Sequence, residues 1–151
     1  SCPSRRWARN NLEDDRDGWL QLLMTHCVEP ALPKNTPVYI FDFPATQAAL
    51  AKIRQAEPAV AERFELYING MELANGFHEL TDADEQRQRF DADLVKRKKM
   101  GKAVVPIDEK LLAALPQMPE CAGVAVGFDR LVMIATESSS IDKVLSFVID
   151  E

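Results

Sequence analysis

The amino-acid sequence predicts an α+β fold, with an antiparallel sheet at the centre of the chain and helices around it. The clearest observation is a central stretch of alternating residues, 63–77, which is interrupted by Asn69-Gly70, a pair typical of the two-residue turn of a β-hairpin. Segments on either side repeat apolar residues at helical spacing or begin at a capping residue. Residues 14–151 are expected to form one domain, and residues 1–13 a loose arm or an artificial remnant.

Composition excludes several classes of protein. The 151 residues are 46% hydrophobic and 28% charged, which is typical of a globular chain and not of a disordered or collagen-like one. The net charge of −6 disfavours tight non-specific binding of nucleic acid, since such binding needs several lysine or arginine side chains at phosphates. No apolar run is long enough to cross a bilayer, and no secretory signal is recognisable. We therefore expect a cytoplasmic chain with no membrane partner.

The elements before the hairpin are predicted from spacing and from proline. Apolar side chains at helical spacing predict a helix over 15–27, which Pro30 and two further prolines bring to an end. The apolar run 38–41 predicts a short strand buried on both faces. Thr46 is then expected to cap a second helix, which reaches residue 56.

The elements after the hairpin are mostly helical. A start that resembles a capping box at 81–84 predicts a surface helix to about residue 100, whose basic end complements the helix dipole. Asp108 is expected to cap a short helix through residue 115. A buried strand over 123–128, a helix over 129–135 and a last element over 141–148 complete the chain.

The hairpin carries two carboxylates on one face. With Asn69-Gly70 at the turn, the apolar side chains share one face, expected to be the core face, while Glu65 and Glu72 lie diagonally on the other. Two glutamates that reach one point suit Mg²⁺. The spacing by itself favours a plainer interpretation, in which both glutamates face water. A general acid/base pair is a third interpretation, for which the sequence offers no histidine or nucleophile beside them.

Three further side chains alternate along the return strand, namely Asn75, Phe77 and Glu79, and therefore share a face. They suit a ligand that carries an amine, or else they are edge-strand polar residues beside one core aromatic side chain. Simple alternation places this face opposite Glu72. All of these side chains reach one site only if a β-bulge near residues 74–76 shifts the register.

Two glycines and an arginine mark the segment 123–130. Gly123 and Gly127 within a strand imply the close approach of a ligand or of another backbone. Arg130, at the start of the following helix, is placed to reach a phosphate. The spacing does not fit a Walker A loop or a dinucleotide fingerprint.

Together these segments resemble a known family. The run RFELYINGMELANGFHELTDADEQRQRF followed by AGVAVGFDRLVM is similar to the C-terminal half of the catalytic domain of class II lysyl-tRNA synthetases. The likeness extends from about Asp14 to Asp150 and is greatest to their shortened bacterial paralogues, the elongation factor P–(R)-β-lysine ligases. The resemblance implies an antiparallel class II sheet flanked by helices, in an enzyme that joins the carboxylate of a lysine-type amino acid to AMP.

The resemblance also implies how ATP and Mg²⁺ are bound. Arg130, with Gly127, matches the family's arginine at the ATP phosphates and is the expected catalytic residue. Glu65 and Glu72 match its metal-binding glutamates in the ATP site, which reverses the interpretation favoured by spacing alone. The expected cofactors are therefore ATP and Mg²⁺.

The same resemblance implies a lysine site. Asn75, Phe77 and Glu79 match the family's lysine-recognition strand, with Glu79 expected to take the ε-ammonium group of the substrate. Two departures favour the ligase branch. His78 stands where synthetases usually have serine, and Ala125 replaces the middle glycine of their third signature. One added methyl group in a pocket shifts preference by about 1–3 kcal/mol, which suits discrimination between α- and β-lysine.

The chain is accordingly expected to be part of a ligase that transfers (R)-β-lysine to elongation factor P, with tRNA disfavoured as the acceptor. The first two class II signatures are not found in the sequence, so the chain is expected to be the C-terminal half of a catalytic domain, and activity of this chain alone stays open. The alternatives are a fragment of an α-lysine–tRNA ligase and a truncated, non-catalytic module that binds a nucleotide or a partner. A homodimer is also an option, since the family is dimeric.

Overall fold

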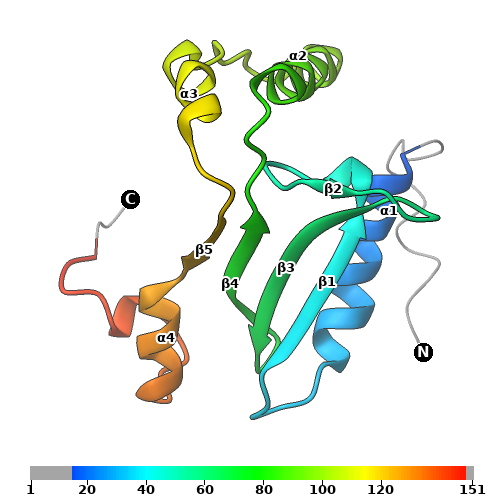
Figure 1. The fold of residues 1–151 in the computed structure, drawn as a ribbon. Coiled ribbons are helices and arrows are strands. Elements are labelled where there is room, and N and C mark those ends of the chain that lie inside the picture. Colours follow the sequence, from blue (N-terminus) through cyan, green and yellow to red (C-terminus); the bar gives the residue numbers. More distant parts are fainter. Residues whose placement is uncertain (1–14, 149–151) are drawn as a thin grey trace.

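The computed structural model of the chain describes residues 15–148. Its antiparallel sheet has five strands in the order β1-β3-β4-β5, with β2 also paired to β3. Figure 1 shows α1 beside β1 at one side of the sheet, α4 on the side of β5, and α2 and α3 next to each other beyond the end of β4. The α+β prediction is confirmed, and the arm predicted over 1–13 lies outside the described residues.

The sequence-predicted elements are mostly present; β1, β3 and β4 are longer than expected, and β5 is shorter. The strands are β1 Val38–Pro44, β2 Ile53–Arg54, β3 Val60–Ile68, β4 Met71–His78 and β5 Ala122–Val126. The helices are α1 Arg16–Leu23, α2 Ala83–Lys99, α3 Glu109–Ala114 and α4 Phe128–Ala135, and α1 continues through a π-helical and a 3₁₀ turn to Ala31. None of the helices between residues 15 and 148 is long and apolar enough to span a membrane.

The prediction of a helix over 46–56 is wrong. After one 3₁₀ turn, Ala49 adopts a left-handed φ of 51°, and the chain then pairs with β3 as β2. The backbone N–H of Lys52 donates to the carbonyl of His78 over 2.8 Å. The sheet therefore takes up hydrogen bonds of this segment, and local spacing gives no sign of such a non-local pairing.

The hairpin turn is confirmed. Asn69 and Gly70 have φ angles of 55° and 75°, the left-handed pair that a type I′ turn requires. The register of β3 and β4 shifts once, next to Tyr67, and Leu73 is the extra residue of a β-bulge. The sequence required a bulge near residues 74–76 to unite its candidate residues, and the bulge lies directly before them.

Burial of the sheet differs from what the sequence predicted. β1, expected to be buried on both faces, exposes Tyr39 and Phe41. The apolar face of the hairpin, expected to be the core, is only partly buried apart from Leu73. On the opposite face Glu65 and Tyr67 are buried, because α1 and the turns after it lie over them. The strand expected to be buried near 123–128 is mostly exposed, since within residues 15–148 it has β4 as its one neighbour in the sheet.

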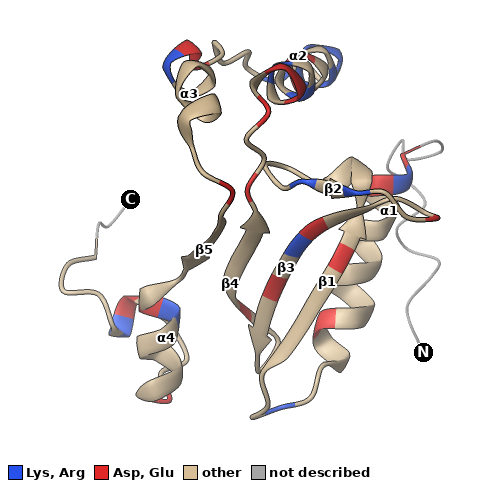
Figure 2. Ribbon diagram, in the orientation of Figure 1, with Lys and Arg blue, Asp and Glu red and all other residues tan. Residues whose placement is uncertain are grey.

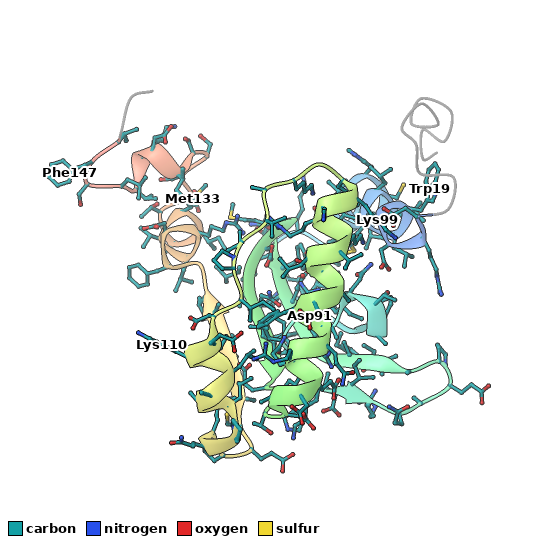
Figure 3. All side chains as sticks on the ribbon, turned by 90° about the horizontal axis from the view of Figure 1, so that it is seen from above. Trp19, Asp91, Lys99, Lys110, Met133 and Phe147 are labelled. Atoms are coloured by element: carbon teal, nitrogen blue, oxygen red, sulfur yellow. The ribbon has the colours of Figure 1, made fainter. Side chains whose placement is uncertain are left out.

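The helices beyond β4 follow local rules. The carboxyl group of Asp82 accepts hydrogen bonds from two backbone N–H groups at the start of α2, and Asp108 does the same for α3. Gln86 is the one buried residue of α2, so the predicted surface helix is confirmed. The element predicted over 141–148 is only a 3₁₀ turn, and Phe147, 90% exposed, extends outward at the side of the molecule away from Trp19 (Figure 3).

Candidate functional site

The β-bulge at Leu73 brings the hairpin's candidate residues onto one face of the sheet. Tyr67 pairs with Glu72 before the bulge, and Glu65 pairs with Asn75 after it. Directly paired residues of antiparallel strands project to the same face, so both glutamates and the asparagine share one face. Without the extra residue, Asn75 would project to the other side.

The neighbouring strand, β5, continues this face. Asn75 pairs with Ala125, and Phe77 pairs with Gly123. A Cβ atom built on Gly123 would lie 2.2 Å from Oε1 of Glu79, so the carboxyl group of Glu79 lies over this glycine. A close approach at Gly123 is present, but it comes from a side chain of the same face and not from the ligand or backbone that the sequence predicted.

Among residues 15–148, Glu79 has no cationic partner. Within residues 15–148 its carboxylate forms no ion pair, whereas Glu65 pairs with Arg63 two residues away on the same strand. A partly buried carboxylate without a counter-charge is an unfavourable arrangement unless a ligand supplies the charge. The geometry therefore suits a positively charged group bound over β5.

Arg63, which the sequence analysis did not single out, lies among the charges of this face. Its guanidinium group pairs with Oε1 of Glu65, and its Nε donates to Oδ1 of Asn75 over 3.2 Å. Its Nη1 donates to the main-chain carbonyl of Gln47 over 3.3 Å. Figure 2 shows a basic stretch between acidic ones along β3. The signal in the sequence was the spacing of Arg63 and Glu65, two residues apart on one strand and therefore on one face.

Two aromatic rings also contact Arg63. Its Cζ lies 4.3 Å from the ring centroid of Phe43 and 5.8 Å from that of Phe77, both within the range of a cation–π interaction. Phe77 is thus already next to a cationic side chain.

Both oxygens of the Glu65 carboxylate are engaged. Arg63 occupies Oε1, and the hydroxyl of Tyr67 donates to Oε2 over 2.6 Å. Burial raises the pKa of the Tyr67 hydroxyl well above its ordinary value, and the hydrogen bond and the charge of Glu65 raise it further. Tyr67 therefore keeps its proton and remains a donor to Glu65.

Two cavities meet at Glu72. One, of about 440 Å³, lies between α1 and the sheet and is lined by Arg63, Glu65, Tyr67 and Glu72. The other, of about 460 Å³, is lined by Glu72 and Arg130 and borders α4. Nη1 of Arg130 donates to the main-chain carbonyl of Glu72 over 2.6 Å and lies 4.0 Å from its Oε2. The two glutamates and the arginine therefore form one continuous polar region.

Gly127 determines how Arg130 reaches this region. It precedes α4 as the N-cap, and its backbone N–H donates to the carbonyl of Leu73 over 2.9 Å. A Cβ atom at Gly127 would lie 3.3 Å from Cδ of Arg130, a tight contact. A larger residue here would therefore press on the side chain that lies against the hairpin.

The structure divides the sequence-predicted site residues into two groups. Glu65, Glu72 and Arg130 adjoin the two cavities, whereas Asn75, Phe77, Glu79 and Ala125 lie farther along the same face and line neither of them. His78 projects to the opposite face, where its Nδ1 lies 2.5 Å from Oε2 of Glu62 and its Nε2 lies 3.1 Å from Oε1 of Glu120.

The donor set fits a divalent cation that is held jointly with phosphate. Between residues 15 and 148 no group of three or more histidine, cysteine or acidic side chains is arranged to hold a metal. Glu65 and Glu72 together offer two carboxylates, and Mg²⁺ typically takes one or two carboxylates and completes its shell with phosphate oxygens and water. The residues present therefore suit Mg²⁺ bound with a nucleotide better than a metal held by protein alone.

Comparison with known proteins shows the family. The family of "tRNA synthetases class II (D, K and N)" matches residues 21–151. Three relatives carry the name elongation factor P–(R)-β-lysine ligase: the protein of Pectobacterium atrosepticum is 53% identical over 139 residues, that of Vibrio cholerae 56% over 136, and that of Klebsiella pneumoniae 55% over 139. The matches cover 91%, 89% and 91% of this chain, but 43%, 42% and 43% of the relatives, so the chain spans less than half of their length. The chain belongs to the class II tRNA synthetase (D, K and N) family.

Proposed function

We propose that the chain is part of an ATP-dependent ligase that activates a lysine-type amino acid as an adenylate and transfers (R)-β-lysine to elongation factor P. The observation that carries this proposal is the bulge at Leu73, which brings Asn75 and Phe77 onto the face of Glu65 and Glu72, where Arg130 contacts Glu72. The names of the three relatives support it. A cytoplasmic location follows from the proposal, because ATP and a translation factor are available there.

In this proposal the residues over β5 bind the amino acid. Glu79 takes the ammonium group, since its carboxylate has no counter-charge among residues 15–148. Asn75 and Phe77 lie beside it on the same face and orient the substrate. Ala125, paired with Asn75, adds a methyl group to the floor of this site and so limits which lysine isomer fits.

The residues at the other end of the face bind the nucleotide. The lysine carboxylate attacks the α-phosphorus of ATP, and the bond from that phosphorus to the departing pyrophosphate breaks. Arg130, positioned by Gly127, neutralises the phosphate charge that develops in this step. Glu65 and Glu72 hold Mg²⁺, which when bound with ATP supplies further charge neutralisation. The proposal assigns no general acid or base among residues 15–148, so their contribution is orientation and electrostatic stabilisation.

The test is amino-acid-dependent ATP–pyrophosphate exchange, with α-lysine and (R)-β-lysine offered in parallel. It is measured on this chain and on a fusion that joins the unmatched upstream part of the Vibrio cholerae relative to it. We expect exchange in the fusion with a preference for (R)-β-lysine, abolition by Arg130→Ala, and no effect of Arg87→Ala, which lies on α2. A preference for α-lysine would instead assign the chain to the tRNA ligases.

A folded fusion that is silent with both isomers would contradict the proposal. If such a fusion still bound ATP, the non-catalytic module would be the better interpretation. Unchanged exchange in Arg130→Ala would remove that residue from the phosphate site.

A further inference from the structure

We propose that Arg63 is a resident counter-ion of Glu65 that competes with the divalent cation for this carboxylate, so that the site has low affinity for free metal. The inference rests on the proposed function, because it assumes that Glu65 and Glu72 hold a divalent cation. It assigns to Arg63 a role as a positioning residue that controls when the metal binds.

The first step in the argument is the burial of Glu65. Its exposed fraction is 8%, and the side chains of Arg63 and Glu65 are 16% and 11% exposed. A buried carboxylate is strongly unfavourable without a partner. Arg63 satisfies that requirement at Oε1 and Tyr67 at Oε2, so Glu65 is stable in the absence of metal.

The second step is that Arg63 is anchored independently of Glu65. Its Nε donates to Asn75, its Nη1 donates to the carbonyl of Gln47, and its planar group lies over the ring of Phe43. Only Nη2 contacts Glu65. A cation can therefore take Oε1 from Nη2 while the other contacts of Arg63 persist, and the exchange does not require the side chain to leave the site.

The third step is the charge around the cavities. Arg63 and Arg130 offset the charges of Glu65 and Glu72, Glu29 lines both cavities, and Asp42, which lines the one beside α1, is paired with Arg54. A cation that binds Glu65 without a nucleotide must displace Nη2 of Arg63 and then lies beside the guanidinium charge. A cation that arrives with a polyphosphate brings compensating negative charge. The arrangement thus favours binding of the metal together with the nucleotide.

The experiment measures Mn²⁺ binding without nucleotide, from the electron paramagnetic resonance signal of the free ion. We expect Arg63→Met to bind Mn²⁺ at least about tenfold more tightly than the native chain, which corresponds to about 1.4 kcal/mol. Adding Glu65→Gln to Arg63→Met should abolish this gain. The matched control is Arg87→Met, which removes the same charge and breaks the ion pair between Arg87 of α2 and Glu109 of α3. Its Mn²⁺ affinity should stay within about twofold of the native value.

The outcomes separate the inference from the proposed function. If the native chain binds Mn²⁺ and Arg63→Met binds it no more tightly, the inference fails and the metal site stands. If no variant binds Mn²⁺ at millimolar concentration, the inference and the proposed metal site fail together.

A measurement on the native chain keeps the inference testable if Arg63→Met does not fold. The ¹H–¹⁵N signal of the Arg63 Nε–H group should move as Mg²⁺ is added to saturation, because the guanidinium loses its contact with Glu65. A signal that stays in place while the metal site fills would overturn the inference.

Discussion

Replacing Gly123 by alanine tests whether the Glu79 carboxylate, which lies over β5, binds the substrate. The new Cβ atom would lie 2.2 Å from Oε1 of Glu79, whereas ordinary contact begins at 3.4 Å, so the carboxylate must withdraw by about 1.2 Å. The obstructed atom is the end of a flexible side chain, and the backbone can stay in place. The substitution therefore moves the group assigned to the substrate ammonium and leaves the sheet intact.

The expected effects on folding and on binding differ in size. Alanine in place of glycine stabilises by about 0.4–1 kcal/mol through the unfolded chain, and a strained rotamer of Glu79 costs about 0.5–1.5 kcal/mol. The free energy of unfolding should thus change by less than about 1 kcal/mol. A hydrogen bond to a charged group contributes about 1.5–3 kcal/mol, so the Kd for lysine or (R)-β-lysine should rise by roughly 10- to 150-fold.

Isothermal titration calorimetry gives the affinity, and urea unfolding gives the stability. Gly76→Ala is the matched contrast, because its Cβ would lie 2.4 Å from the ring of Phe64 on the opposite face. That variant should lose about 1–3 kcal/mol of stability by overpacking, with the affinity of its folded fraction within about threefold of native. The reasoning is refuted if Gly123→Ala binds both isomers as tightly as the native chain, or if it is as unstable as Gly76→Ala.

The metal, the substrate isomer and the response to acid each give a further prediction. Glu65→Gln combined with Glu72→Gln should weaken the Mg²⁺ dependence of exchange in the fusion, and an unchanged Mg²⁺ titration would remove both glutamates from the metal site. Ala125→Gly should shift the kcat/KM ratio towards α-lysine by about tenfold or more, and an unaltered ratio would contradict the steric argument. The hydrogen bond from Arg87, and then its charge, hold the pKa of the Glu109 carboxyl below its usual range. A carboxyl group whose pKa is lowered in the folded state stabilises the fold at pH values above its unfolded-state pKa. This stabilisation is lost as the pH falls through the folded-state pKa. Acid should therefore loosen α3 from α2, and Glu109→Gln should remove this part of the pH dependence of unfolding, whereas parallel native and variant curves would argue against the pair.

The sequence by itself determined the features that depend on a few neighbouring residues. The Asn69-Gly70 turn follows from the left-handed backbone that this pair tolerates, and the caps at Asp82 and Asp108 follow from side chains that accept from the next backbone N–H groups. Spacing on the hairpin also placed Glu65 and Glu72 as diagonal neighbours. Their assignment as Mg²⁺ ligands came from the family resemblance, because spacing alone favoured an interpretation in which both side chains face water.

The tertiary structure decided what depends on contacts between distant segments. The position of the extra residue, Leu73, fixes whether Asn75 shares a face with Glu65, and the sequence stated that condition without deciding it. The partner of Glu65 and the burial of its face depend on α1 and on Arg63. Likewise β2 replaces a predicted helix because its hydrogen bonds go to other strands. Register and burial follow from non-local pairing, and local patterns do not contain that information.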